Sequence, residues 1–161
     1  MRVLGVDPGL AETGYAVVEV SDGKGIPLDW NTVRTDPGDA MPKRLQKIFT
    51  DFEKIIKKWN VHFVVLEDVY VLPRYPNAAL QLGAVQGVVK LAAARENVEV
   101  KELKPTELKM ALTGNGRAGK DQVERVVRKI LRFEEKIKPD HVSDALALAV
   151  VGLSRFGKIR W

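Results

Sequence analysis

The alternation of apolar and polar residues along the chain places its β-strands. Three short segments, rich in branched and small apolar residues, are typical of strands: 1–7, 13–20 and 27–35. Asp22 and Gly23 mark a turn between the second and third segments. A continuous apolar run at 62–68 predicts a strand that is buried on both faces. The pattern therefore predicts a sheet that contains a hairpin and at least one further strand.

Helical periodicity appears in five longer segments, and we expect helices at 41–60, 76–96, 104–113, 121–131 and 139–153. The second of these is apolar around most of its circumference, which is more than one core-facing stripe requires. Gly83 and Gly87 would let another helix approach it closely, and a two-fold copy of the same helix is the economical partner. The alternative is a neighbouring helix within the monomer. The last helix is apolar on nearly all sides from Ala145 onward, so we expect it to pack deep against the sheet.

The stretch GNGRAGKD, which begins at Gly114, matches two nucleotide-binding patterns at once. Gly114, Gly119 and Lys120 fit G-x-x-x-x-G-K, and the glycines also fit G-x-G-x-x-G. A phosphate-binding loop of the first kind needs a strand before it and Ser or Thr after the lysine. Here a predicted helix precedes the loop and Asp121 follows the lysine. We interpret the stretch as a connection between helices, either a flexible linker or a grip for the phosphate of a larger ligand, with Arg117 and Lys120 beside free backbone N–H groups.

Acidic residues stand where two predicted strands end, at Asp7 and Glu67. The segment between these strands contains a helix, so the strands can run parallel, and neighbouring strands lie ~4.8 Å apart. A third acid, Asp144, shares one face of the last helix with His141. Taken singly, Asp before Pro-Gly is a common turn former, and a lone histidine is more often structural than a ligand. Taken together, three carboxylates at the ligand-binding edge of an open α/β sheet predict a magnesium or manganese site, because cations relieve their repulsion.

Composition narrows the class of protein. The 161 residues include no cysteine and only two histidines, which excludes disulfides, thiol nucleophiles and Cys-ligated zinc. An apolar content of 45% is enough to bury one core, so we expect a single domain over residues 1–161. The longest apolar run, ALALAVVGL, is too short for a membrane span, and Asp7 interrupts the N-terminus too early for a secretory signal. We therefore expect a cytoplasmic, soluble protein.

The basic excess of the chain is confined to one segment. The formal net charge is +5, and residues 101–138 hold 11 Lys and Arg against 6 Asp and Glu, whereas the rest of the chain holds 15 of each. Such a surface would attract nucleic acid, although a charge run is also typical of a solvated helix face. Charge alone does not decide between these two interpretations.

Five ordered blocks resemble the RuvC-type Holliday junction resolvases: GVDPGLAETGYAVVE at 5–19, LEDVY at 66–70, LQLGAVQGVV at 80–89, KPTELKMALTGNGRAGKDQV at 104–123 and HVSDALALA at 141–149. The blocks span nearly the whole chain. The resemblance implies an α/β fold of the ribonuclease H-like type, with a five-stranded mixed sheet flanked by helices. It also implies a homodimer that resolves four-way (Holliday) DNA junctions by metal-dependent, paired nicking of two strands of like polarity.

The resemblance assigns roles to individual residues. It implies a metal site for two magnesium ions, with manganese as a substitute, formed by Asp7, Glu67, His141 and Asp144. It implies that Lys109 and Lys120 are basic residues near the scissile phosphate and that Tyr70 lies beside the junction. We add Arg74 and Arg117 as further DNA contacts. Many family members have a carboxylate in place of His141, although a histidine variant occurs, so direct ligation by His141 stays open, as does the choice between the two lysines. A branch-migration motor complex is left open as a further partner.

Three alternatives compete with a junction resolvase. An RNA-processing nuclease of the YqgF-like type also has a first strand that ends in Gly-x-Asp, but the second helix and the basic segment favour the junction nuclease. An actin-like ATPase needs a second lobe, for which 161 residues are too few. A junction-binding module without catalysis would not need all three acids.

Overall fold

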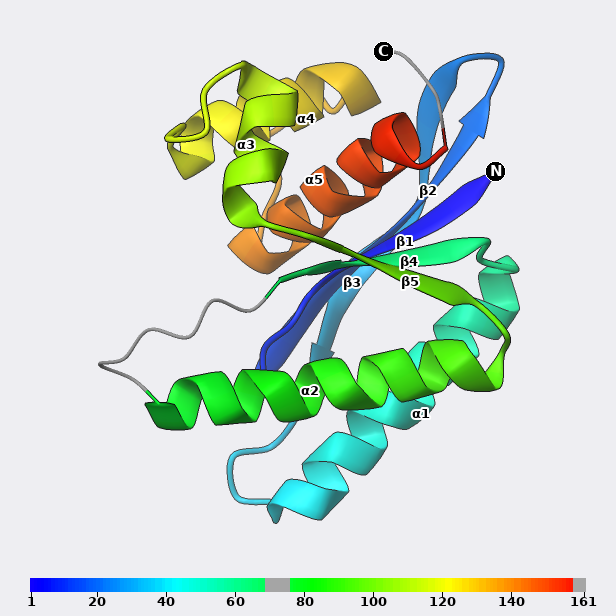
Figure 1. The fold of residues 1–161 in the computed structure, drawn as a ribbon, viewed down its shortest axis with the longest axis vertical. Coiled ribbons are helices and arrows are strands. Elements are labelled where there is room, and N and C mark those ends of the chain that lie inside the picture. The colour runs from blue at the N-terminus through cyan, green and yellow to red at the C-terminus, as the bar shows by residue number, and fades with distance from the viewer. Residues whose placement is uncertain (69–75, 158–161) are drawn as a thin grey trace.

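Five strands form one sheet in the computed structural model, which describes residues 1–68 and 76–157 (Figure 1). The strands are β1 (Arg2–Asp7), β2 (Glu12–Ser21), β3 (Lys24–Arg34), β4 (Phe63–Glu67) and β5 (Glu99–Leu103). Their order across the sheet is β3-β2-β1-β4-β5. Strands β1 to β3 pair antiparallel, whereas β4 pairs parallel with both β1 and β5. The sheet is therefore mixed, as the family resemblance implies.

The four strands that the apolar pattern predicts are all present, and β5 is the one that the pattern misses. Asp22 and Gly23 both have positive φ and link β2 to β3 in the predicted two-residue turn. β5 lies at the edge of the sheet and has charged side chains at three of its five positions, Glu99, Lys101 and Glu102. Edge strands tolerate such charges, so apolar periodicity gives no signal for them.

Helices cover both faces of the sheet (Figure 1). One face holds α1 (Met41–Trp59) and α2 (Pro76–Arg95), and the other holds α3 (Pro105–Thr113), α4 (Lys120–Leu131) and α5 (Asp140–Arg155). Successive strand residues alternate between the two cores: Val3 and Val65 pack with α5, whereas Leu4 and Val64 pack on the side of α1 and α2. Among the described residues, no helix has the length and apolar character needed to cross a membrane.

The C-terminal helix α5 lies unusually close to the sheet because glycines replace side chains beneath it. A Cβ added to Gly5 of β1 would stand 2.1 Å from the carbonyl oxygen of Ala145 and 2.7 Å from the amide nitrogen of Ala149. On β2, a Cβ at Gly14 would stand 2.1 Å from the carbonyl oxygen of His141. All three distances are well inside van der Waals contact, so these two glycines set the depth at which α5 lies. The predicted deep packing of this helix is confirmed.

Candidate active site

Two acidic residues leave the sheet side by side at the carboxyl ends of β1 and β4. The two strands are parallel neighbours, and Val6 pairs with Leu66, so Asp7 and Glu67 follow at matching positions. Asp7 is only 8% exposed, whereas Glu67 is half-buried. The expectation that these strands run parallel and bring the two acids to one edge is confirmed.

The first turns of α5 bring His141 to the same edge. Nδ1 of His141 lies 2.6 Å from Oδ2 of Asp7. Gly14 is paired with Asp7 across β1 and β2 and lies directly beneath the backbone of His141, so no side chain stands in the way. Sequence reasoning did not identify Gly14 as a site residue, because its role depends on a contact between β2 and a helix more than a hundred residues away.

Lys120 reaches the edge from the start of α4. Its Nζ lies 3.0 Å from Oδ2 of Asp144, one turn after His141 in α5. The loop before it connects two helices, with Gly114 as the left-handed C-cap of α3 and Gly119 as the N-cap of α4. Since α3, and not a strand, precedes this loop, the context required for a nucleotide-binding P-loop is absent from it.

Electrostatics links the three carboxylates. The pKa of Glu67 is raised to about 7, mainly by burial and also by the charges of Asp7 and Asp144, while Lys120 and Lys109 oppose the shift. Burial also raises the pKa of Asp7 above its ordinary value, against the lowering effect of the hydrogen bond from His141, and the charge of Asp144 again adds to the rise. The charges of Asp7 and Asp144 therefore make ionisation of Glu67 less favourable, and the charge of Asp144 does the same for Asp7. A cation at this edge would relieve that cost.

The donor set suits a hard divalent cation. Carboxylate oxygens from Asp7, Glu67 and Asp144 are the ligands that magnesium and manganese prefer, and an imidazole is compatible with manganese. As they stand, no three acidic or histidine side chains in the described ranges converge into a group that could hold an ion. Asp7 instead contacts His141, and Asp144 contacts Lys120. These residues nevertheless suit a cation, because a bound cation would offset the repulsion between their carboxylates.

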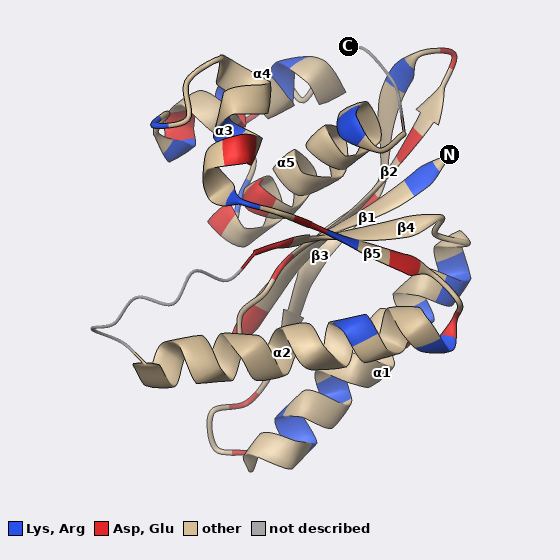
Figure 2. Cartoon of the chain, in the orientation of Figure 1, with Lys and Arg blue, Asp and Glu red and all other residues tan. Residues whose placement is uncertain are grey.

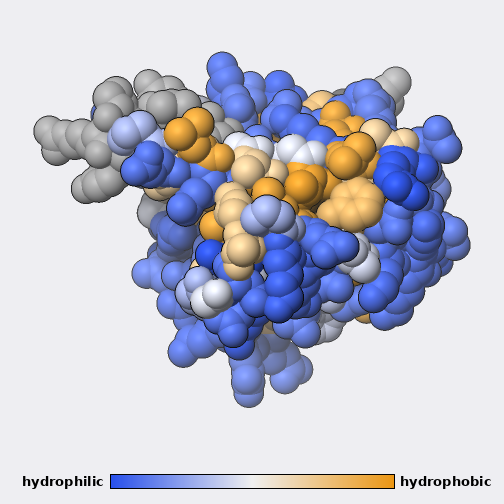
Figure 3. Space-filling model, turned by 90° about the horizontal axis from the view of Figure 1, so that it is seen from below, coloured by the Kyte–Doolittle hydropathy of each residue, from blue (hydrophilic) through white to orange (hydrophobic). Residues whose placement is uncertain are grey.

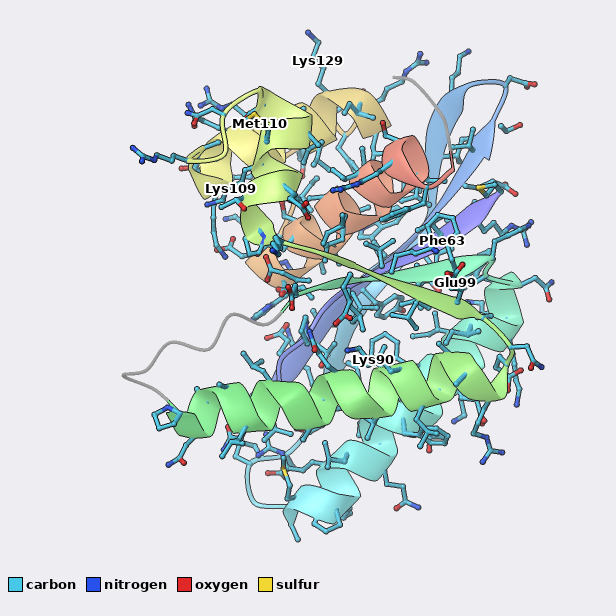
Figure 4. All side chains as sticks on the ribbon, in the orientation of Figure 1. Phe63, Lys90, Glu99, Lys109, Met110 and Lys129 are labelled. Atoms are coloured by element: carbon cyan, nitrogen blue, oxygen red, sulfur yellow. The ribbon has the colours of Figure 1, made fainter. Side chains whose placement is uncertain are left out.

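The structure describes two of the four remaining predicted DNA contacts. Lys109 lies on α3, close enough for its charge to act on Glu67 (Figure 4). Arg117 is exposed in the loop between α3 and α4. Tyr70 and Arg74 lie outside the residues that the structure describes.

A further residue fixes the end of β4. The amide Nε2 of Gln86, on α2, donates a hydrogen bond of 2.5 Å to the backbone carbonyl of Glu67. Gln86 is 6% exposed and sits among apolar side chains of the helix. A polar residue on the buried face of an apolar helix is a sequence signal that could have drawn attention to it.

An open mixed sheet in the order β3-β2-β1-β4-β5, with acids at the ends of β1 and β4 and on the C-terminal helix, defines a ribonuclease H-like nuclease. Residues 3–152 match the family model described as crossover junction endodeoxyribonuclease RuvC. A crossover junction endodeoxyribonuclease RuvC from Heliobacterium modesticaldum is 43% identical over 93% of this chain and 92% of its own length. The chain therefore belongs to the RuvC family.

Solved structures agree with this assignment. The Thermus thermophilus RuvC structure covers 99% of both chains with a TM-score of 0.89 and 31% identity. The same Thermus protein in complex with Holliday junction substrate gives a TM-score of 0.90, again at 31% identity, and covers 99% of this chain and 98% of that chain. The yeast mitochondrial Holliday junction resolvase shares the fold, with a TM-score of 0.63 at 15% identity, over 92% of this chain and 77% of that chain.

Proposed function

We propose that the protein is a metal-dependent endonuclease that resolves four-way DNA junctions by paired, symmetric nicks in two strands of like polarity. The observation that supports this most directly is the meeting of Asp7, Glu67 and Asp144 at one sheet edge of a RuvC-family chain. A relative solved with a Holliday junction substrate supports the choice of DNA substrate. The proposal includes one nuclease domain over residues 1–161, action in the cytoplasm during recombination and repair, and a branch-migration motor as a further partner.

The chemistry is divided among residues of the carboxylate edge. Asp7, Glu67 and Asp144, with His141, would hold two magnesium ions, for which manganese can substitute. When bound, these ions supply an activated water and neutralise charge on the phosphodiester. Lys120 is the side chain placed to donate to a phosphoryl oxygen, because its Nζ already lies at the edge, 3.0 Å from Asp144.

Part of the basic segment, from α3 to the first residue of α4, supplies the proposed DNA surface. Lys109 on α3 and Lys120 at the start of α4 act electrostatically on Glu67, and Arg117 is exposed in the loop between these two helices. The N-terminus of α4 adds the partial positive charge of its helix dipole to this phosphate-binding surface. Tyr70 and Arg74 complete the set that we propose for junction contacts.

A homodimer through α2 would supply two such sites. Leu80 and Leu91 of this helix are 73% and 53% exposed, and a Cβ at Gly83 or Gly87 would meet nothing within 4 Å. Lys90 and Arg95 are its only charged residues, and the helix is accordingly almost uniformly tan in Figure 2. Figure 3, which views this side of the molecule, shows apolar surface between hydrophilic borders. A second copy of α2 would cover such a face and leave the two carboxylate edges related by two-fold symmetry.

Cleavage of synthetic DNA tests the proposal. The wild-type protein should nick a four-way junction in the presence of magnesium and leave a linear duplex of the same sequence intact. Asp7→Asn should still bind the junction, since it removes a metal ligand and leaves the basic surface unchanged, while its cleavage rate falls by about three orders of magnitude or more. Gel-shift and single-turnover measurements on the same DNA separate binding from cutting. Equal cutting of junction and duplex, or parallel loss of binding and cutting in Asp7→Asn, would reject it.

A further inference from the structure

An apolar groove lies on the outer side of α3, α4 and α5. One hollow of about 660 Å³ has Leu112, Ile130 and Val151 in its lining. A second hollow of about 690 Å³ continues past the same Leu112 and Ile130 to Val126. We call the two hollows together the α3–α4 groove. Its far end, at Ser154, lies ten residues beyond Asp144 along α5, or about 15 Å from the carboxylate edge.

The rim of the α3–α4 groove carries charge of one sign. Its lining includes Arg125, Lys129 and Arg155 and no acidic side chain. Arg155 is 3.4 Å from Glu107, whereas Arg125 and Lys129 have no ion-pair partner among the described residues. Lys129 projects outward from α4 into solvent (Figure 4). The groove therefore combines an apolar floor with cations that are available to an incoming ligand.

We propose that the α3–α4 groove docks an acidic peptide segment of another protein, which places apolar side chains on the floor and carboxylates against the rim. Charge complementarity selects this occupant, because three cations line the groove, and two of them, Arg125 and Lys129, have no ion-pair partner among the described residues. The apolar floor disfavours DNA, whose backbone is held by polar donors. A two-fold copy of the same groove is also disfavoured, because it would bring Arg125, Lys129 and Arg155 against the same cations.

The position of the groove keeps it separate from the other surfaces. The apolar face of α2 lies on the opposite side of the sheet from α3 and α4 (Figure 1). Lys109, Arg117 and Lys120, which are proposed to contact DNA, do not line the groove, although Asn115 and Gln122 of its lining flank the loop that holds Arg117 and Lys120.

Three synthetic peptides test the docking site, each about 15 residues long and helix-forming. The first probe has leucines along one face and glutamates elsewhere; the second replaces the leucines by serine, and the third replaces the glutamates by lysine. Only the first should bind, and the methyl NMR signals that it shifts should be those of Leu112, Val126 and Ile130. The double variant Arg125→Glu/Lys129→Glu should weaken its binding by roughly tenfold or more. Junction cleavage without peptide should be unchanged in this variant.

Lys54→Glu is the matched control. Lys54 is an exposed lysine on α1 without an ion-pair partner among the described residues, as Lys129 is on α4. Its variant should bind the first probe as the wild type does. Equal binding of the leucine and serine probes, equal weakening by both variants, or shifts centred on Leu80 and Leu91 would overturn the proposal. Loss of junction binding in the rim variant would instead identify the groove as a DNA surface, which also overturns it.

Discussion

At the scale of single residues, the raised pKa of Glu67 predicts how the stability of the protein depends on pH. Its pKa is raised to about 7 in the folded protein, mainly by burial, against an ordinary value of 4.5. The folded state therefore binds a proton more tightly than the unfolded state, so that the stability of the metal-free protein falls as pH rises from about 4.5 through about 7. Glu67→Gln removes this loss, and we expect its Tm near pH 8 in EDTA to exceed the wild-type value by about 3–6 °C.

Scanning calorimetry across pH measures the effect of Glu67→Gln. The difference in Tm between the two proteins should shrink toward about pH 4.5, where the wild-type carboxyl group is protonated in the folded state. The exposed residue Glu134 provides the control, since Glu134→Gln should show no such dependence. A Tm difference that stays constant with pH would contradict the linkage between Glu67 and the carboxylate edge.

The imidazole of His141 leads to a second prediction, which concerns the preference of the site for manganese over magnesium. An imidazole nitrogen favours manganese over magnesium more than a carboxylate oxygen does. His141→Asp gives an all-oxygen site, so the variant should stay active while the ratio of its cleavage rates in manganese and magnesium falls. Single-turnover rates with each metal in excess measure that ratio. If the ratio is the same in both proteins, His141 orients Asp7 through their 2.6 Å contact and does not bind metal.

At the scale of elements, the docking of α5 on β1 determines both stability and the geometry of the site. Gly5→Ala places a methyl group 2.1 Å from the carbonyl oxygen of Ala145, a backbone atom that moves only with the helix. We expect a loss of at least about 3 kcal/mol in the free energy of unfolding, measured in urea. Gly119→Ala is the control, because a Cβ there meets nothing within 4 Å and φ is −74°. Comparable losses in the two variants would show that the close approach of α5 is not the cause.

The elements also show what sequence can and cannot predict. Asp7 and Glu67 could be placed together because each ends a strongly apolar strand, and the helix between them allows a parallel pair. β5 gave no apolar signal, since it is a charged edge strand, and only the family resemblance implied it. The pairing of His141 with Asp7 depends on how deep α5 lies, and Gly5 and Gly14 fix that depth through contacts that are remote in sequence.

At the scale of the whole molecule, the proposed two-fold assembly through α2 is the feature that one chain cannot supply. Gly83→Leu adds a side chain whose Cβ meets nothing within 4 Å in the monomer, but it would push a second α2 away. We expect a folded monomer by light scattering, with a circular dichroism spectrum like that of the wild type. A dimer that persists in this variant would place the interface on another surface.

Paired cutting by that dimer is the central claim, and a supercoiled plasmid with an extruded cruciform tests it most directly. Two sites related by a two-fold axis cut opposite strands within one encounter, so the wild type with magnesium should convert the plasmid directly to its linear form. Gly83→Leu, if monomeric, should give mainly nicked circles, since a first cut releases the supercoiling that maintains the cruciform. Nicked circles as the main wild-type product, or linear product from a monomeric Gly83→Leu at the wild-type rate, would contradict paired resolution by a two-fold dimer.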